Sequence, residues 1–281
     1  MGLGIGIGTS LLAQRLHASN TKSLAGSLEK LATGKRINHG KDDPAGLITS
    51  ENFRAVLAVL DAEVRTVRRV DAVANVADGA MAEISSLLVE AKGLAVASAN
   101  TSGMSKEEIQ ANQMQLNSIM NSINRISSST NFNGNALLDG TASFTVDGET
   151  LNIDSTRTSN LGETVVGGDT FTLADLSSGG SLNLENGNLE AASQAISNAI
   201  SQIASQRGSI GAYQKYTLGS SISYKKVAIE NIAAANSLIR DTDYAKETAE
   251  LVRSQMLVKS SLGVLAIMNA INKQSVYQLL G

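Results

Sequence analysis

An apolar seam from Val56 to Ala95 constrains the fold of this chain more than any other feature of its sequence. Successive seam positions are separated by four and then three residues, and all of them except Glu63 are apolar. This spacing places the seam on one side of a single long helix of the coiled-coil type. A compact domain cannot easily hold such a rod, so we expect an elongated molecule. The seam consists of Val56, Leu60, Glu63, Val67, Val70, Ala74, Ala77, Met81, Ile84, Leu88, Ala91 and Ala95.

A second helix is predicted after a break at residues 100–103. Ser105 is its expected N-cap, with Glu108 as the capping-box partner three residues later. The helix should end near the turn sequence STNFNG at residues 129–134. Its apolar side contains Ile109, Leu116, Ile119, Ile123 and Ile126.

Helical spacing returns in the last third of the chain. One pattern runs from Leu189 to Tyr213, and the apolar positions resume between Ile222 and Ile239. A last helix should then extend to Leu280, capped by a residue of Asp241 to Asp243, with Asp241 or Thr242 as the expected cap. Helices therefore occupy both ends of the chain.

The middle segment, from about Leu137 to Gly187, has a different pattern. The stretch SFTVDGETLNID alternates around Asp147-Gly148, a dipeptide that favours tight hairpin turns. One Pro, no Trp and 3% aromatic residues suit long helices packed side by side elsewhere. The predicted fold is mainly α: an elongated coiled-coil-like bundle of long helices from both termini, with a small β-hairpin-containing segment in the middle.

The last helix carries no charge between Lys259 and Lys273. It is apolar on more than one face, so it must be covered on several sides. The N-terminal leucines offer one helix of cover, which is not enough, and we expect other copies to supply the rest. The predicted self-assembly residues are Leu12, Leu16, Leu24, Leu28, Leu31, Leu257, Leu262, Leu265, Met268, Ile271 and Leu279.

Composition argues against several classes of function. The net charge of −3 gives no global field toward nucleic acid or a membrane surface. No uninterrupted run of about 18 apolar residues appears, so we expect no membrane insertion. The N-terminus lacks the basic region of a secretory signal peptide. Cys is absent, which suits a protein exported between redox compartments.

The stretch LATGKRINHGKDDPAG, residues 31–46, superficially resembles a phosphate-binding loop. A phosphate-binding loop has four residues between its first glycine and the Gly-Lys pair, whereas five residues separate Gly34 from Gly40 here. Asp42 also stands where that loop needs the hydroxyl of Ser or Thr. We interpret Asp43 instead as an N-cap, with Pro44 as the first helical residue. His17 and His39 lack the partners of a zinc site. We therefore expect no metal, no cofactor and no catalytic residues.

Two further features have ordinary interpretations. Arg65, Arg68 and Arg69 form a small basic cluster, which we interpret as a solvated or intersubunit ion-pairing face rather than a nucleic-acid site. The alternating glycines from Gly2 to Gly8 suggest a flexible N-terminal tail.

Motifs at both ends resemble those of bacterial flagellin. The N-terminal motif is carried by Leu31, Gly34, Arg36, Ile37, Asn38, Asp42, Asp43, Ala45 and Gly46. Blocks at residues 77–84, 94–100 and 130–134 resemble later family motifs, and residues 239–245 and 254–280 resemble the C-terminal signature. The likeness covers roughly residues 10–140 and 189–280. Arg240 departs from it, because an acidic residue is common there.

The resemblance implies a division into three domains. Residues 1–42 with 241–281 would form the inner tube of a filament from the terminal helices, and residues 43–140 with 188–240 a layer of long helices around it. Residues 141–187 would form a small β-rich segment, with no large outer domain. The turn or spoke between tube and layer would contain Arg36, Asn38, Asp42, Asp43 and Gly46.

The resemblance also implies a function: a secreted structural subunit, not an enzyme, that polymerises into the extracellular flagellar filament for swimming. It would be exported unfolded through the flagellar type III apparatus. Its implied partners are further copies of itself, an export chaperone, and the filament cap and hook-junction proteins.

Many flagellins are recognised by an innate immune receptor, and the resemblance locates the equivalent positions. Val89 replaces a glutamine, Glu90 a central arginine and Gln115 a glutamate, while Leu94 is retained. Because charge reversal at the centre of an interface is costly, we expect weak receptor activation.

Other functions are compatible with parts of the sequence. A hook–filament junction protein shares the terminal helices but does not extend a filament. An enzyme carried in the middle segment is a third hypothesis, but residues 141–188 contain no His and no Cys, which argues against a zinc protease. Adhesion by the β-rich segment and O-glycosylation of its Ser and Thr residues stay open.

Overall fold

The computed structural model describes residues 2–99 and 103–280, without the side chains of 2–7, 275, 276 and 278–280. The described residues form six α-helices: α1 (Gly2–Thr33), α2 (Pro44–Ser98), α3 (Lys106–Ser129), α4 (Leu189–Ala212), α5 (Gly219–Arg240) and α6 (Tyr244–Leu280). A 3₁₀ turn, η1 (Leu173–Leu176), precedes α4, and a π-helix, η2 (Tyr213–Leu218), joins α4 to α5. The mainly α fold with a small β-containing middle is as predicted.

Three antiparallel strand pairs lie between α3 and α4. They are β1 (Asn131–Phe132) with β2 (Asn135–Ala136), β3 (Ser143–Val146) with β4 (Glu149–Asn152), and β5 (Thr164–Val166) with β6 (Asp169–Phe171). In the second pair Val146 faces Glu149 across a two-residue turn. Both turn residues have positive φ, 51° at Asp147 and 89° at Gly148, as a type I′ turn requires. The predicted hairpin is confirmed.

The contacts divide the chain into two units. Unit 1 comprises residues 1–60 and 228–281, and unit 2 comprises residues 61–227. These units do not coincide with the three domains proposed from the sequence, which concern an assembled filament and stay a prediction.

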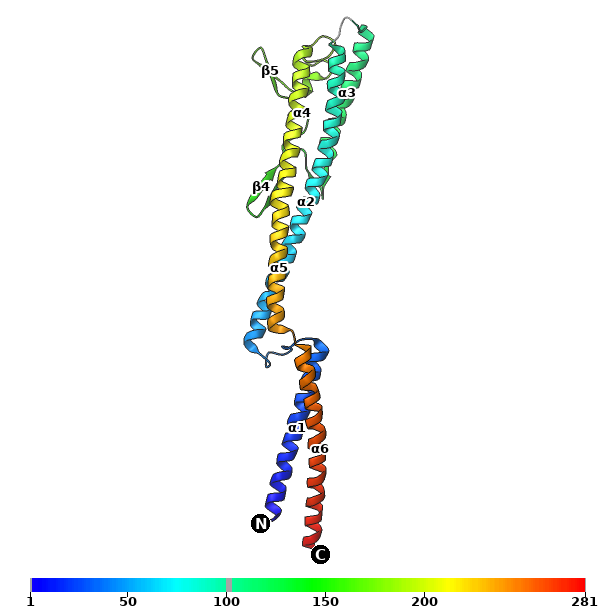
Figure 1. The fold of residues 1–281 in the computed structure, drawn as a ribbon. Coiled ribbons are helices and arrows are strands. Elements are labelled where there is room, and N and C mark those ends of the chain that lie inside the picture. The colour runs from blue at the N-terminus through cyan, green and yellow to red at the C-terminus, as the bar shows by residue number, and fades with distance from the viewer. Residues whose placement is uncertain (1, 100–102, 281) are drawn as a thin grey trace. The chain divides into compact units, whose positions relative to one another are not determined.

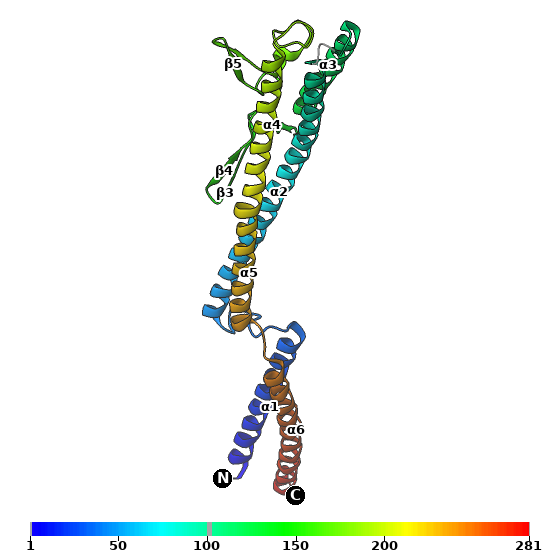
Figure 2. The same ribbon diagram turned by 45° about the horizontal axis from the view of Figure 1, so that its top comes forward.

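Unit 2 contains a hydrophobic core between its helices. Figures 1 and 2 show α2, α3 and α4 side by side. From Val67 onward the seam of α2 faces this core, and Ala74, Ile84 and Leu88 are fully buried. α3 contributes Leu116 and Ile123. The 4-3 spacing therefore identified the buried face of α2 correctly in this unit.

The predicted helix caps are confirmed at two starts. At α3 the side chain of Ser105 accepts a hydrogen bond from Glu108 N, and Glu108 Oε2 accepts one from Ser105 N. At α2 the carboxylate of Asp43 accepts a hydrogen bond from Gly46 N at 2.9 Å. Pro44 is the first residue of that helix, where its missing N–H leaves no donor unsatisfied.

The predicted cap segment of α6, Asp241 to Asp243, is confirmed, but two more specific predictions about helix ends are wrong. α6 is capped by Asp243, whose Oδ1 accepts from Ala245 N and Lys246 N, whereas Asp241 accepts the hydroxyl hydrogen of Ser237. α1 begins at Gly2, so residues 2–8 are helical rather than a tail. Glycine weakens a helix by about 1 kcal/mol relative to alanine but does not prevent its backbone hydrogen bonds.

Candidate assembly surfaces

The terminal helices α1 and α6 lie side by side in unit 1 (Figure 1). Their contact is narrow and partly polar. His17 Nδ1 lies 3.0 Å from Ser261 Oγ, and Asn20 Nδ2 donates to Leu257 O at 3.4 Å. Lys30 pairs with Glu247 at 3.5 Å. One α-helical partner therefore covers only one side of α6.

The predicted assembly leucines fall into two groups. Leu24 and Leu31 of α1 are half-buried on either side of the buried Ser27. Leu265 and Met268 of α6 are half-buried on the helix that carries the buried Ser254. They lie at the 3-4 positions that form the side of each helix toward the other. The side chain of Leu279 lies outside the described residues.

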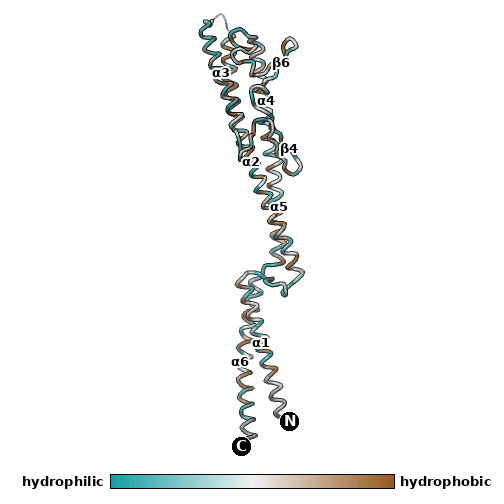
Figure 3. Tube along the Cα trace, turned by 180° about the vertical axis from the view of Figure 1, so that it is seen from behind, coloured by the Kyte–Doolittle hydropathy of each residue, from teal (hydrophilic) through white to brown (hydrophobic). Residues whose placement is uncertain are grey.

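The other predicted residues are exposed. About half of the surface of each remains open: Leu12, Leu16, Leu28, Leu257, Leu262 and Ile271. Sequence reasoning missed Leu11, Met256, Val264, Ile267 and Tyr277, which are exposed on the same two helices. The uncharged stretch between Lys259 and Lys273 had indicated that α6 needs cover on more than one side. Figure 3 shows that hydrophobic positions recur along both α1 and α6.

Length and composition alone would let two described helices cross a membrane. These helices are α2 and residues 244–274 of α6. Of the most apolar 18-residue stretch in each helix, 33% is buried in α2 and 6% in α6. Both stretches have a high mean hydropathy, but polar residues interrupt them, so neither is an uninterrupted run of about 18 apolar residues. Absence of membrane insertion thus stays a prediction for α6.

The predicted spoke lies between α1 and α2, and it pairs with the segment between α5 and α6. Arg36 N donates to Arg240 O at 2.7 Å, and Thr242 N donates to Gly34 O at 3.0 Å. Lys35 and Asp241 form an isolated antiparallel bridge. The two connecting segments are therefore held together by backbone hydrogen bonds.

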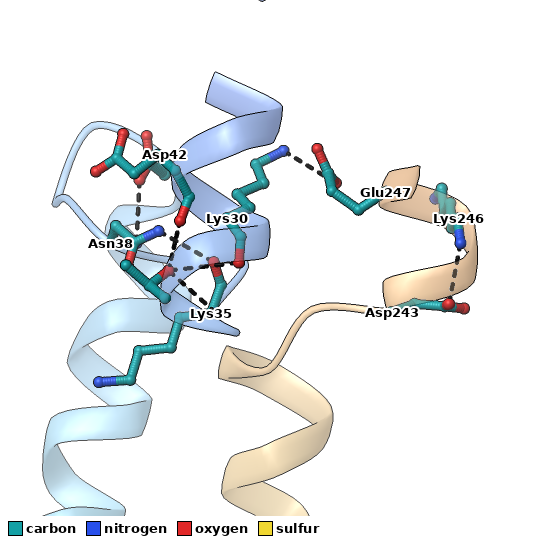
Figure 4. A network of polar contacts seen from close by, with 9 residues as sticks. Lys30, Lys35, Asn38, Asp42, Asp243, Lys246 and Glu247 are labelled. Carbon is teal, nitrogen blue, oxygen red and sulfur yellow. Dashed lines mark hydrogen bonds and ion pairs between the residues drawn. The ribbon is translucent and has the colours of Figure 1, made fainter. Parts of the chain in front are cut away.

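Side chains add to these backbone hydrogen bonds. Figure 4 shows Lys35, Asn38 and Asp42 of the predicted spoke beside the Lys30–Glu247 ion pair. The Arg36 guanidinium donates to Ile239 O at 2.6 Å and lies 3.6 Å from the Asp43 carboxylate. Asn38 Nδ2 donates to Lys35 O at 3.0 Å. Arg36, Asn38 and Asp43, three of the predicted spoke residues, thus have defined polar contacts.

Asp42 closes the turn between the two helices. Its Oδ2 accepts from His39 N at 2.8 Å and from Asn38 N at 3.1 Å. The hydrogen bond from His39 N is the main reason that the pKa of Asp42 lies below its usual value. Asp42 therefore holds the turn between α1 and α2 through hydrogen bonds to two backbone N–H groups.

Arg240, the residue that departs from the flagellin-like motif, joins α5 to α2. It donates to Glu51 at 2.8 Å and to Ser50 Oγ at 3.3 Å. Arg54 also contacts Glu51, and the hydrogen bonds from Arg54 and then Arg240 lower the pKa of that carboxyl. A basic residue at position 240 thus has an acidic partner within unit 1.

The receptor-equivalent positions lie on α2 and α3. Glu90 and Gln115 both line a shallow groove of about 470 Å³ together with Leu87 and Met114. Val89 is exposed outside this lining, and Leu94 is half-buried. No group of three or more His, Cys, Asp or Glu side chains that could hold a metal occurs among the described residues.

Comparison with known proteins identifies the family. Residues 8–143 match the bacterial flagellin N-terminal helical region, and residues 193–280 match the bacterial flagellin C-terminal helical region. The chain is 31% identical over 294 residues to the flagellin of Bacillus subtilis strain 168, with 95% of each chain covered. The chain belongs to the bacterial flagellin family.

A further relative agrees with this assignment. The flagellar filament 30.7 kDa core protein of Treponema maltophilum is 30% identical to this flagellin over 287 residues, with 97% of each chain covered. The crystal structure of Bacillus cereus flagellin aligns with 66% of this chain and 93% of its own, with 21% identity and a TM-score of 0.41. As a member of this structural family, the protein is a subunit of the extracellular flagellar filament.

Proposed function

We propose that this flagellin extends the filament by burying the exposed apolar faces of α1 and α6 against other copies. The observation that carries the proposal is the exposure of α6 on the sides away from α1. Leu262 is 51% exposed and Ile267 62% exposed, although both lie in the longest uncharged part of the helix. An apolar helix that one partner cannot cover is typical of an assembly element.

The magnitudes require many contacts to form together. Full burial of one Leu or Ile side chain is worth roughly 1.5–3 kcal/mol. Association costs about 4–15 kcal/mol in lost translational and rotational freedom. Several half-exposed side chains of α1 and α6 must therefore be buried in one step. A single neighbouring copy gives less cover than the end of a filament does.

Membership of the flagellin family supports the rest of the proposed assembly scheme. In it, residues 1–42 and 241–281 form the inner tube, and residues 43–140 with 188–240 surround it. Residues 141–187 are the small β-rich part. The chain is secreted unfolded, and an export chaperone covers α6 before assembly. Cap and hook-junction proteins contact its ends, and the protein has no enzymatic activity.

Filament extension tests the proposal directly. Purified protein is added to short filament seeds and examined by electron microscopy, beside a chain truncated after Asp241 that lacks α6. We expect long filaments from the intact chain only. Failure of the intact chain to extend across varied salt and pH would favour the junction-protein alternative.

Insertion of α6 into lipid is the main competing explanation for its exposed surface. Vesicles of neutral and of anionic lipid, mixed with the intact protein and floated on a density gradient, separate the two. We expect the protein to stay with the soluble fraction and to extend seeds equally well in the presence of vesicles. Flotation that depends on α6 would contradict this expectation.

Weak receptor activation is a second proposal for the same chain. It is supported by Glu90 and Gln115, which lie in one groove and differ in charge from the residues that the family carries there. Reporter cells that carry the receptor should respond less to this protein than to a flagellin with the usual residues. Exchanging Glu90→Arg and Gln115→Glu should increase the response.

A further inference from the structure

Methionine is the side chain of this protein that mild oxidants attack first. The sequence contains seven Met residues, no Cys and no Trp. A peroxide converts the thioether of Met to a sulfoxide, and no thiol is present in the chain to compete for the oxidant. Which methionines react then depends on their access to the oxidant in solution.

Two methionines are strongly exposed. Met114 of α3 is 61% exposed and Met256 of α6 is 65% exposed. We therefore expect these two thioethers to react with peroxide first and at similar rates. The other described methionines, which are buried or partly covered, are Met81, Met104, Met120 and Met268.

Met256 lies on the side of α6 that faces away from α1. Ser254 is buried and Val258 is partly covered, and each lies two residues from Met256. Two residues of an α-helix turn through about 200°, so Met256 lies on the opposite side from both. Val252 and Ile267 share the side of Met256 at helical spacing, and both are exposed. Met256 thus belongs to an apolar stripe that α1 does not cover.

Oxidation changes the character of this stripe. The sulfur of Met256 attacks one oxygen of hydrogen peroxide, the O–O bond breaks, and a sulfoxide and one water molecule form. The sulfur is oxidised by two electrons, which the peroxide takes up. The new oxygen accepts hydrogen bonds from water, and its burial without a donor costs free energy. Val252 and Ile267, on the same side of α6, have no donor to offer it.

We propose that Met256 is an oxidation site at which a peroxide blocks assembly of this flagellin. The inference rests on the proposed function, because the sulfoxide acts by opposing burial of α6 against other copies. The sensitive stage is the monomer, in which the thioether is open to solvent. The loss is recoverable, since methionine sulfoxide reductases return the sulfoxide to the thioether.

Met114 provides an internal comparison. It is nearly as exposed as Met256, but it lies on α3 in unit 2 and lines the shallow groove there. It is not part of the exposed apolar faces of α1 and α6. Oxidation of Met114 should therefore proceed at a similar rate without the same effect on assembly.

Limited oxidation of the monomer with hydrogen peroxide tests the site. Peptide mass spectrometry measures the sulfoxide fraction at each methionine, and light scattering measures how fast the treated monomer extends untreated seeds. Full oxidation of Met256 should lower the extension rate of wild type at least about 10-fold. Treatment with the two methionine sulfoxide reductases, one for each sulfoxide epimer, should restore most of that rate.

Two substitutions assign the effect to one position. Met256→Leu removes the oxidisable sulfur but keeps an apolar side chain, and Met114→Leu does the same at the other exposed site. For each protein, the extension rate after peroxide is divided by its own rate before treatment. This ratio should stay within about 2-fold of unity for Met256→Leu and fall at least about 10-fold for Met114→Leu. Circular dichroism checks that each treated monomer is folded.

The outcomes separate this inference from the filament function. If a folded wild-type monomer with Met256 fully oxidised extends seeds at its untreated rate, or if Met256→Leu loses as much of its rate as wild type, the oxidation site is overturned while the filament function stands. If Met256→Leu fails to extend seeds before treatment, Met114→Leu decides, because its rate must then fall in step with the sulfoxide fraction at Met256. If untreated wild type fails to extend seeds, the filament function and this inference fall together.

Discussion

Gly46 shows how one residue fixes the start of α2. A Cβ at this position would lie 2.4 Å from Asp43 Oδ2 and 2.8 Å from Ile37 Cδ1. The Asp43 carboxylate caps the helix through Gly46 N, and Ile37 is fully buried. A side chain at position 46 would therefore disturb both the cap and a buried contact of the connector.

Gly46→Ala should lower the free energy of unfolding of unit 1 by about 1–3 kcal/mol, because the cap and Ile37 must both move. Gly79→Ala is the matched control, since Gly79 lies in the same helix with nothing within 4 Å of a new Cβ. The control should stabilise the protein by up to about 1 kcal/mol. Thermal unfolding followed by circular dichroism measures both. Equal effects of the two changes would contradict the steric argument.

Asp147 fastens the β3–β4 hairpin to α5. Its carboxylate accepts from the Ser221 hydroxyl and from Lys225 Nζ, the latter at 3.0 Å. The Ser221 hydrogen bond, followed by that of Lys225, lowers the pKa of Asp147. Asp147 in turn is the main reason that the pKa of Lys225 is raised. Tyr213 adds hydrogen bonds from its hydroxyl to Phe144 O and Glu149 O.

The sign of the pH effect follows from these shifts. A lowered Asp147 pKa contributes stability above the usual Asp value of about 3.9, and this stability is lost as pH falls through the lower folded value. A raised Lys225 pKa contributes stability below about 10.4, which is lost as pH rises through the folded value. The attachment should therefore be strongest between these limits.

Asp147→Asn should destabilise unit 2 at pH 7 by roughly 0.5–1 kcal/mol, a small effect because solvent screens a carboxylate that is 48% exposed. Asn tolerates the left-handed backbone of this turn position, so the turn itself is kept. Thermal unfolding of both proteins between pH 7 and about 2 measures the difference, which should shrink at the acid end. A difference that stays constant with pH would show that the ionised carboxylate is not responsible.

Lys225 also explains a residue that sequence reasoning left as an exception. Glu63 was the one polar position of the α2 seam, and its Oε2 lies 3.0 Å from Lys225 Nζ. The two residues are separated by most of unit 2 along the chain. No local periodicity could reveal that pairing, because the pattern reports which face is buried and not which partner covers it.

At the scale of elements, regular patterns were predictable and irregular junctions were not. The long seam predicted α2, and the Asp147-Gly148 dipeptide predicted the hairpin turn. The π-helix Tyr213–Leu218 was missed, although it lies in the gap between the apolar pattern that ends at Tyr213 and the one that resumes at Ile222. The cap of α6 was displaced to Asp243, since several neighbouring polar residues could serve equally well.

The assembly helices illustrate a second limit of sequence reasoning. α6 is apolar on several sides, so its pattern could not separate residues that face α1 from residues that face solvent. Leu265 is mostly covered beside α1, whereas Leu262, three residues earlier, is 51% exposed. We therefore expect the two leucines to contribute to different steps, Leu265 to the folded monomer and Leu262 to the filament.

Leu265→Ala should weaken the α1–α6 pair in the monomer by about 1–2 kcal/mol, less than for a fully buried leucine. Leu262→Gln should leave monomer unfolding within about 0.5 kcal/mol of wild type but slow seed extension. Circular dichroism of the monomer and light scattering of seeded assembly measure the two effects. A Leu262→Gln protein that extends seeds at the wild-type rate would exclude this residue from the interface.

At the scale of the whole molecule, the two units differ in what completes them. Unit 2 encloses its own core, with Met81, Ile84 and Leu88 fully buried within one copy. Unit 1 leaves much of α1 and α6 uncovered. The sequence could predict this contrast from the uncharged stretch alone, but it could not show where the stable core ends.

Amide hydrogen exchange should report the contrast directly. In the monomer, amides of α2 around Ile84 should exchange slowly, because opening them requires breaking the unit 2 core. Amides of α6 between Met256 and Ile271 should exchange much faster, since α1 covers them through a narrow contact in the described part of the chain. In filaments the α6 amides should become at least about 100-fold slower, while those of α2 change little. Strong protection of α6 already in the monomer would mean that one copy stabilises this helix by itself, and the assembly argument would then lose its driving force.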